Sequence, residues 1–216
     1  MSLSPQVLLS SIARERCIAK LKELPIIFNL KTKQSAAVLV PICVDKGKVC
    51  LLYTLRSSKL KNHSGQVSFP GGKMDENETI FDTALRETEE EIGIPKADID
   101  VWSEMPKVIG RNKEVLISPV VGLVKNFDVN KLKPNLDEVE EIFTIPMEVF
   151  CDPTNHAHNL YEKNILPIFF NEKHTIWGIT GLITHFFLQC FLPENEYKVD
   201  FLRKKLTFAE LMPAKL

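Results

Sequence analysis

Residues 72–94, GKMDENETIFDTALRETEEEIGI, are the stretch of sequence that decides the fold. The pattern predicts a helix from about Glu78 to Ile92, with Asn77 as its N-cap and Gly93 as the residue that ends it. With about 100° of rotation per residue, one narrow stripe of this helix is expected to face the core. The members of that stripe are Phe81, Leu85, Thr88 and Ile92.

Three glutamates lie roughly opposite this stripe. Glu87, Glu90 and Glu91 are spaced i, i+3 and i+4, so their carboxylates repel one another unless a cation holds them together. Mg²⁺ binds such oxygen ligands and completes its shell with water and substrate phosphates. Arg86 precedes Glu90 by one turn and is expected to pair with it or with Glu78. The spacing suits a metal site, although a glutamate-rich run alone is more typical of a solvated helix face.

The flanking residues extend the pattern beyond the helix. It reads Gly, five residues, Glu, seven residues, and then Arg-Glu-aliphatic-x-Glu-Glu-x-Gly-aliphatic. This stretch resembles the Nudix box, and the matching residues are Gly72, Glu78, Arg86, Glu87, Glu90, Glu91, Gly93 and Ile94. Thr88 departs from the pattern, because the family prefers an aliphatic residue there. Its hydroxyl is expected to donate to the carbonyl of Ala84 one turn back.

The Nudix resemblance implies both a fold and a chemistry. The fold is a mixed β-sheet sandwiched between α-helices, with a loop-helix-loop that carries the metal. The chemistry is hydrolysis of a nucleoside diphosphate linked to another moiety. The resemblance implies Mg²⁺ or Mn²⁺ held by Glu87 and Glu91, with Glu90 as the third ligand and Arg86 fixing the carboxylates. Glu87 is the first candidate for the general base, and Glu138 is the second.

A second signature lies upstream of the box. LYTLRS at 52–57, Lys61, Gly65 and FPGG at 69–72 are similar to the signature of the coenzyme A diphosphatase branch of the family. Tyr53 departs from leucine and Lys61 from arginine, and lysine lacks the bidentate fork. The implied substrate contacts are Arg56, Ser57, Lys61, His63, Gly65, Phe69, Gly71 and Gly72. The cations available for the 3′-phosphate of coenzyme A are Arg56, Lys59, Lys61, Arg111 and Lys113.

This branch resemblance implies hydrolysis of the diphosphate bond of coenzyme A or its derivatives. The products would be adenosine 3′,5′-bisphosphate and 4′-phosphopantetheine or its acylated form. Two alternatives stay open. The same helix would serve a diphosphatase that acts on NADH or ADP-ribose, or the fold would be a non-catalytic nucleotide-sensing module, for which a broken carboxylate set is expected.

The rest of the chain mixes short β-type runs with two helices. A helix is predicted over about 5–24, and a hairpin is predicted from 36–44 and 49–55. Neither a repeat nor a break in composition divides the chain. We therefore expect one α/β (α+β mixed) domain over 1–216. The remaining predicted strands are 114–124, 140–145, 165–170 and 175–178.

Composition excludes several classes of protein. Of 216 residues, 44% are hydrophobic and 25% are charged, which excludes a disordered or collagen-like chain. The formal charge of −1 provides no field to attract nucleic acid or an anionic membrane, so neither is expected as a partner. The most apolar stretch, 176–192, is short for a bilayer and has helical periodicity. It is predicted to be a buried core helix.

Two short motifs stand apart from these signatures. Ala214-Lys215-Leu216 resembles the Ser-Lys-Leu peroxisomal address, which predicts an import receptor as partner and a location in the peroxisome. His156 and His158 have a spacing that can bind metal, but they are expected to lie in a polar loop without further ligands. The five cysteines show no pairing pattern and are expected to be reduced.

Overall fold

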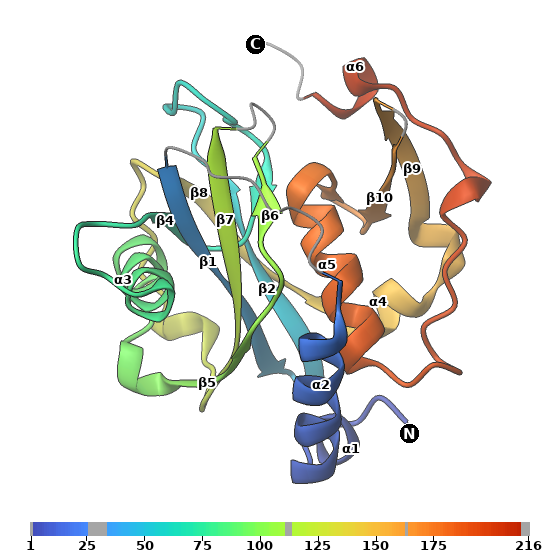
Figure 1. Cartoon of the computed structure of the whole chain (residues 1–216), viewed down its shortest axis with the longest axis horizontal. Coiled ribbons are helices and arrows are strands. Elements are labelled where there is room, and N and C mark those ends of the chain that lie inside the picture. Colours follow the sequence, from blue (N-terminus) through green and yellow to red (C-terminus); the bar gives the residue numbers. More distant parts are fainter. Residues whose placement is uncertain (1, 26–33, 111–113, 163, 213–216) are drawn as a thin grey trace.

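The computed structural model describes residues 2–25, 34–110, 114–162 and 164–212. An eight-stranded mixed sheet has helices on both of its faces. A three-stranded sheet lies outside the helices on one of these faces, on the side away from the large sheet (Figure 1). The predicted mixed α/β fold is confirmed. The strands of the large sheet are β1 (Gln34–Asp45), β2 (Lys48–Arg56), β3 (Val67–Ser68), β4 (Gly71–Lys73), β5 (Ile99–Glu104), β6 (Val108–Ile109), β7 (Val115–Val124) and β8 (Val139–Pro146).

The centre of the large sheet is the parallel pair β1 and β7. The neighbouring strands run antiparallel, and β1 joins β2 through the predicted hairpin. Lys46 and Gly47 at its turn have φ angles of 48° and 78°, the left-handed region that a two-residue hairpin turn requires. At the other end of the hairpin, β2 pairs with both β3 and β8, which brings the segment after Arg56 next to the start of β8.

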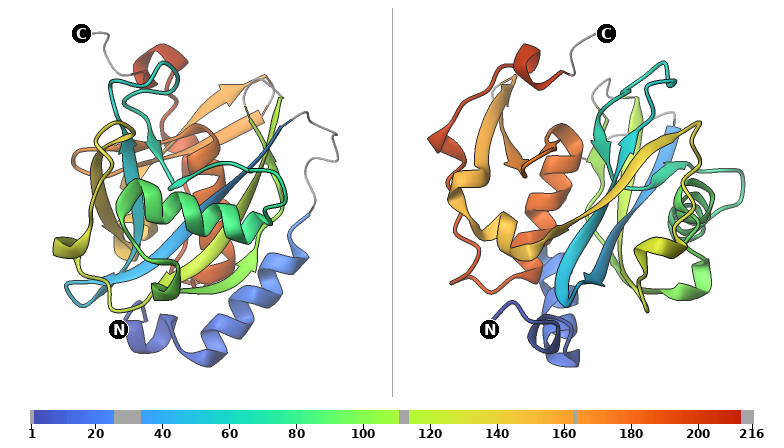
Figure 2. Two further views of the ribbon diagram at one scale, coloured as in Figure 1. Left: turned by 90° about the vertical axis from the view of Figure 1, so that its left-hand side faces the viewer. Right: turned by 180° about the vertical axis from the view of Figure 1, so that it is seen from behind.

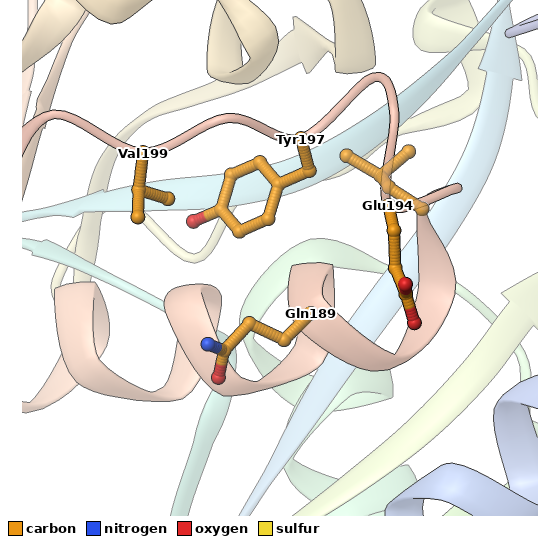
Figure 3. A pocket seen from close by; sticks show the side chains of 5 residues that line it. Gln189, Glu194, Tyr197 and Val199 are labelled. Carbon is orange, nitrogen blue, oxygen red and sulfur yellow. The ribbon is translucent and has the colours of Figure 1, made fainter.

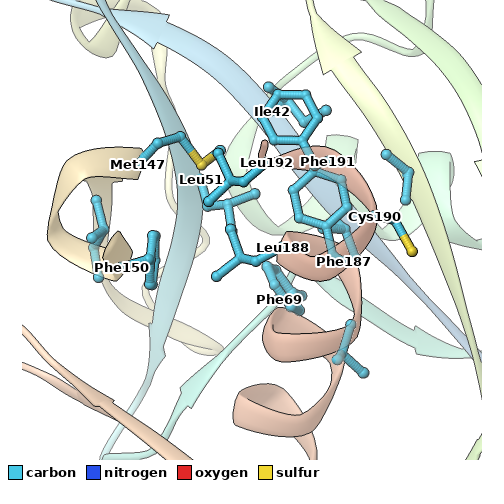
Figure 4. Close-up of a cluster of buried hydrophobic side chains, with 14 of the residues drawn as sticks. Ile42, Leu51, Phe69, Met147, Phe150, Phe187, Leu188, Cys190, Phe191 and Leu192 are labelled. Carbon is cyan, nitrogen blue, oxygen red and sulfur yellow. The ribbon is translucent and has the colours of Figure 1, made fainter. Parts of the chain in front are cut away.

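Helix α3 (Ile80–Ile92) covers one face of this sheet, and α5 (Gly178–Phe191) covers the other (Figures 1 and 2). The α5 side holds the larger core, in which Phe187 and Phe191 pack with residues of β1 and β2 (Figure 4). The stretch predicted as a buried core helix is therefore α5. Within the described ranges, no helix has the length and apolar character needed to cross a bilayer.

The smaller elements lie around these layers. The three-stranded sheet contains β9 (His156–Tyr161), β10 (Asn164–Phe170) and β11 (Thr175–Ile176). The predicted strands 114–124, 140–145, 165–170 and 175–178 correspond to β7, β8, β10 and β11. The remaining helices are α1 (Pro5–Leu8), α2 (Ser11–Glu23), α4 (Met147–Cys151) and α6 (Phe208–Leu211), with 3₁₀ turns at Lys96–Asp98, Val129–Lys131, Pro153–Asn155 and Phe201–Arg203.

Two local predictions are wrong. The helix predicted over about 5–24 is divided into α1 and α2, because the Ser10 hydroxyl accepts a hydrogen bond from the Ala13 amide (3.2 Å) and starts a new helix. His156 and His158 lie in strand β9 instead of a polar loop. Both rings are buried and hydrogen-bond to backbone carbonyls, those of Phe150 and Phe201, so both histidines have structural partners.

Candidate active site

Helix α3 starts two residues later than the sequence pattern suggests. Its N-cap is Thr79, which forms a capping box with Asp82, whereas the predicted N-cap Asn77 lies in the preceding turn with φ of 68°. The helix starts at the capping box because its two side chains accept hydrogen bonds from two backbone amides, those of Thr79 and Asp82. The C-terminal prediction is confirmed. Gly93 has φ of 75°, and its amide donates to the carbonyl of Glu89.

The buried face of α3 is rotated from the predicted stripe. Thr88 and Ile92 are buried as expected, but Phe81 is 38% exposed. Ala84 and Glu91 take its place, and Glu91 is only 4% exposed. The expected hydrogen bond from the Thr88 hydroxyl to the Ala84 carbonyl is present at 2.7 Å. One of the three glutamates therefore points toward the sheet instead of toward solvent.

Arg86 connects several of the acidic side chains. Its guanidinium binds both oxygens of Glu78, at 2.7 and 3.0 Å. It also donates to Glu87 at 2.9 Å and to Glu90 at 3.1 Å, and it reaches the carbonyl of Lys73. Both pairings predicted for Arg86 are confirmed. The Arg86 guanidinium holds the pKa of Glu78 at about 2, and one cation restrains the rotamers of three carboxylates.

Glu87 and Glu91 form the buried part of the site. Burial is the main cause that raises the pKa of Glu87, and Arg86 opposes it. Burial also raises the pKa of Glu91 to about 8, against the opposing charge of Arg56. The negative charge of Glu87 raises the pKa of Glu91 further. Two neighbouring carboxylates with this little solvent need positive charge nearby to ionise together.

The paired glycines before the helix contact these carboxylates in two different ways. The Gly71 amide donates to Oε2 of Glu91 at 3.3 Å. A Cβ atom on Gly72 would overlap the carboxylate of Glu87. Both glycines are expected from the sequence as substrate contacts, whereas their contacts with the two glutamates are not predicted by it. A glycine pair that precedes a glutamate-bearing helix is the signal that could have suggested it.

Glu138 and Arg56 reach the same region from the sheet. The negative charge of Glu138 contributes to the raised pKa of both Glu87 and Glu91. The Ser57 amide donates to the carbonyl of Glu138 at 2.8 Å and joins the end of β2 to the start of β8. The Arg56 Nε is buried and has no hydrogen-bond partner among the described residues. The end of β2 that carries Arg56, the turn that carries Glu138 and the last turn of α3 are therefore joined by backbone hydrogen bonds.

Carboxylate oxygens are the ligands that a hard divalent cation prefers, although the three glutamates are not arranged around a common centre. Across residues 2–25, 34–110, 114–162 and 164–212, no group of three His, Cys, Asp or Glu side chains is arranged to hold a metal ion. Glu90 is the outlying member, with a side chain that is 58% exposed and paired to Arg86. Glu87 and Glu91 supply buried negative oxygens, the donors that Mg²⁺ and Mn²⁺ bind. These two residues are the best-placed ligands.

The upstream loop contributes exposed and buried residues. Lys61 and His63 are exposed, and the His63 ring hydrogen-bonds to Gln66. The Gly65 amide donates to the Arg56 carbonyl, which closes the loop. Phe69 is 4% exposed and stacks on Tyr53, so its position in the signature serves the core. Ser57 is also 4% exposed, which leaves little of it for a substrate. Arg111 and Lys113 lie outside the described residues.

A hollow of about 250 Å³ lies elsewhere, between α5 and the segment that follows it (Figure 3). Its lining residues are Gln189, Leu192, Glu194, Tyr197 and Val199. None of them belongs to the candidate site around Glu87 and Glu91, because these two residues lie on α3, on the other side of the large sheet (Figure 1).

Comparison with known proteins identifies the family. A model of the NUDIX domain matches residues 33–166. The mitochondrial coenzyme A diphosphatase NUDT8 of Homo sapiens is 40% identical over 166 residues, covering 74% of this chain and 70% of that protein. The peroxisomal coenzyme A diphosphatase NUDT7 of Mus musculus is 40% identical over 131 residues, covering 60% of this chain and 52% of that protein.

A solved structure agrees at the level of the fold. A MutT/nudix family protein from Enterococcus faecalis has a TM-score of 0.53 and 17% identity, covering 84% of this chain and 69% of that one. The predicted resemblance to the Nudix box is thus supported by the domain match, by relatives near 40% identity and by the arrangement of sheet and helices. The chain belongs to the Nudix hydrolase family and is an enzyme of that family.

Proposed function

We propose that this enzyme hydrolyses the diphosphate bond of coenzyme A and its derivatives. The products are adenosine 3′,5′-bisphosphate and 4′-phosphopantetheine or acyl-phosphopantetheine. The observation that carries the proposal is that β2 places Arg56, from the coenzyme A signature, opposite Val139 at the start of β8, and that the turn before Val139 hydrogen-bonds to the Glu91 carbonyl of the Nudix box. Relatives of about 40% identity that are named coenzyme A diphosphatases support it.

The residues divide the work of the reaction. Glu87 and Glu91 would hold Mg²⁺ or Mn²⁺, and Glu90 would serve as a third ligand only after leaving its 3.1 Å hydrogen bond to Arg86. The metal would supply positive charge that neutralises the diphosphate and favours ionisation of water. Arg86 keeps the Glu87 carboxylate in place through its 2.9 Å hydrogen bond. Arg56 and the exposed Lys61 bind phosphate oxygens of the substrate.

Glu87 or Glu138 acts as the general base. It accepts a proton from a water molecule, whose oxygen forms a bond to one phosphorus atom. The bond from that phosphorus to the bridging oxygen breaks, and the electron pair leaves with the other phosphate. The intact carboxylate set argues against the alternative of a non-catalytic nucleotide-sensing module.

A comparison of substrates tests this function. Initial rates with coenzyme A, an acyl-coenzyme A, NADH and ADP-ribose are measured at equal concentrations of Mg²⁺ and again with Mn²⁺. We expect kcat/KM for a coenzyme A substrate to exceed that for NADH and ADP-ribose by at least tenfold, because the 3′-phosphate adds charge-assisted contacts. A higher kcat/KM with NADH or ADP-ribose would replace the proposal by the alternative that the sequence left open.

The compartment is a separate part of the proposal. One of the two relatives is named as a mitochondrial protein and the other as a peroxisomal protein. We propose the peroxisome, with Ala214-Lys215-Leu216 read by an import receptor. These residues lie outside the described part of the chain, so the support is their sequence. A fluorescent protein fused before residue 1 is expected to enter peroxisomes, and addition of two glycines after Leu216 is expected to leave it cytosolic. Entry into mitochondria would contradict the proposal.

A further inference from the structure

A tight turn between the 3₁₀ segment Val129–Lys131 and β8 connects α3 to Glu138. The Asn135 amide donates to the carbonyl of Glu91 at 2.9 Å. The Asn135 carbonyl in turn accepts from the amides of Glu138 and Val139, at 2.9 and 2.8 Å. One residue is therefore hydrogen-bonded both to the end of α3 and to the residue that carries the second candidate base.

Side chains fix the shape of this turn. Oδ1 of Asn135 accepts from the amide of Asp137 at 3.2 Å, which is the geometry of an Asx turn. The buried Ser57 closes it from the other side. Its amide donates to the carbonyl of Glu138 at 2.8 Å, and its hydroxyl donates to the carbonyl of Leu136 at 3.4 Å. The backbone on both sides of the Glu138 Cα atom is held by hydrogen bonds.

Among the described residues, the Glu138 side chain forms no hydrogen bond or ion pair. It is exposed, and its orientation depends on the backbone that carries it. Asp137, the residue before it, pairs with Lys59 at 2.9 Å. The turn thus separates two adjacent carboxylates: Asp137 pairs with a surface lysine, whereas the Glu138 backbone is joined through Asn135 to the last turn of α3, which carries Glu91.

We propose that Asn135 and Ser57 are positioning residues that hold Glu138 over the carboxylates of α3. The inference rests on the proposed function, because it takes Glu138 as a group that acts on the reacting water. Asn135 acts through its Asx turn, and Ser57 acts from behind the glutamate instead of touching substrate. A carboxylate displaced by about 1 Å from its working position loses much of its catalytic effect.

The Asx turn offers a direct test. We expect Asn135→Ala to lower kcat for coenzyme A hydrolysis roughly tenfold while KM changes less than twofold, since the lost hydrogen bond orients a catalytic group and binds no substrate. Asn135→Asp keeps an oxygen acceptor for the Asp137 amide and is expected to restore most of the rate. Asp128→Ala is the matched control, because it removes a similar bond to the amide of Asn130 in the same loop.

A double-mutant cycle with Glu138→Gln separates this inference from the proposed function. If Asn135 acts through Glu138, Asn135→Ala lowers kcat no further in the Glu138→Gln background. An equal loss in both backgrounds, or a full rate for Asn135→Ala beside a slow Glu138→Gln, overturns the positioning role and leaves the function intact. A wild-type rate for Glu138→Gln removes the base that is to be positioned. If Asn135→Ala does not fold, Ser57→Ala takes its place in the same cycle.

Discussion

Glu87→Gln is expected to lower kcat for coenzyme A hydrolysis by a hundredfold or more while the protein stays folded. The substitution keeps the shape of the side chain and an oxygen that can accept the 2.9 Å hydrogen bond from Arg86. It removes the negative charge that would ligate the metal or accept the proton of water. Losses of this size are typical when a metal ligand or general base is removed. The measurements are kcat on coenzyme A with saturating Mg²⁺ and the thermal midpoint of unfolding.

Glu89→Gln is the matched control for this variant. Glu89 lies on the same helix, is exposed, and is turned away from the Glu87 carboxylate, so its neutralisation is expected to change kcat less than twofold. Glu87→Gln and Glu89→Gln change the net charge equally, but only the first is expected to lower kcat. A hundredfold loss in both variants would point to the charge of the helix as a whole, and a normal rate for Glu87→Gln would remove the proposed mechanism.

The sequence was sufficient to predict the framework of the site because the signals there are local. A glycine after the last turn, a threonine that bonds one turn back, and an arginine one turn from a glutamate each depend on nearby residues alone. Gly93, Thr88 and Arg86 behave as predicted for this reason. The β1–β2 hairpin was predictable on the same grounds, from the lysine-glycine turn between two apolar runs.

The parts that sequence reasoning missed depend on tertiary packing. The buried face of α3 is set by the sheet beneath it, where Gly72 leaves space that the Glu87 carboxylate fills and the Gly71 amide donates to the Glu91 carboxylate. A hydrophobic stripe alone favours Phe81 as a core residue, yet Glu91 is buried against the sheet instead and accepts a hydrogen bond from the Gly71 amide. The contacts of Asn135 are equally non-local, since they join α3 and β8, two elements that are far apart in the sequence. No periodicity in the sequence marks such a residue.

Glu91→Gln is expected to make the metal-free protein more stable while it weakens metal binding. Burial raises the pKa of Glu91 from 4.5 to about 8, so between these values the folded state binds more protons than the unfolded state. The stability of the wild type therefore falls as pH rises from about 4.5 to 8. Glutamine resembles the protonated acid and carries no such penalty. We expect a gain on the order of 2 kcal/mol at pH 8, which shrinks toward pH 5.

Urea unfolding in the presence of a chelator, at pH 5.5 and pH 8, measures this gain, with Glu89→Gln as the control that should show none. Mg²⁺ supplies the second half of the test, because a ligand that binds only the folded state stabilises it by about 2.7 kcal/mol at one hundred times its Kd. The wild type should gain this stabilisation, and Glu91→Gln should lose most of it. A variant that is less stable than the wild type at pH 8 would mean that Arg56 and the Gly71 amide already satisfy the ionised carboxylate. In that case Glu91 would be a structural ion-pair partner, and the metal would have to be held by Glu87 with other groups.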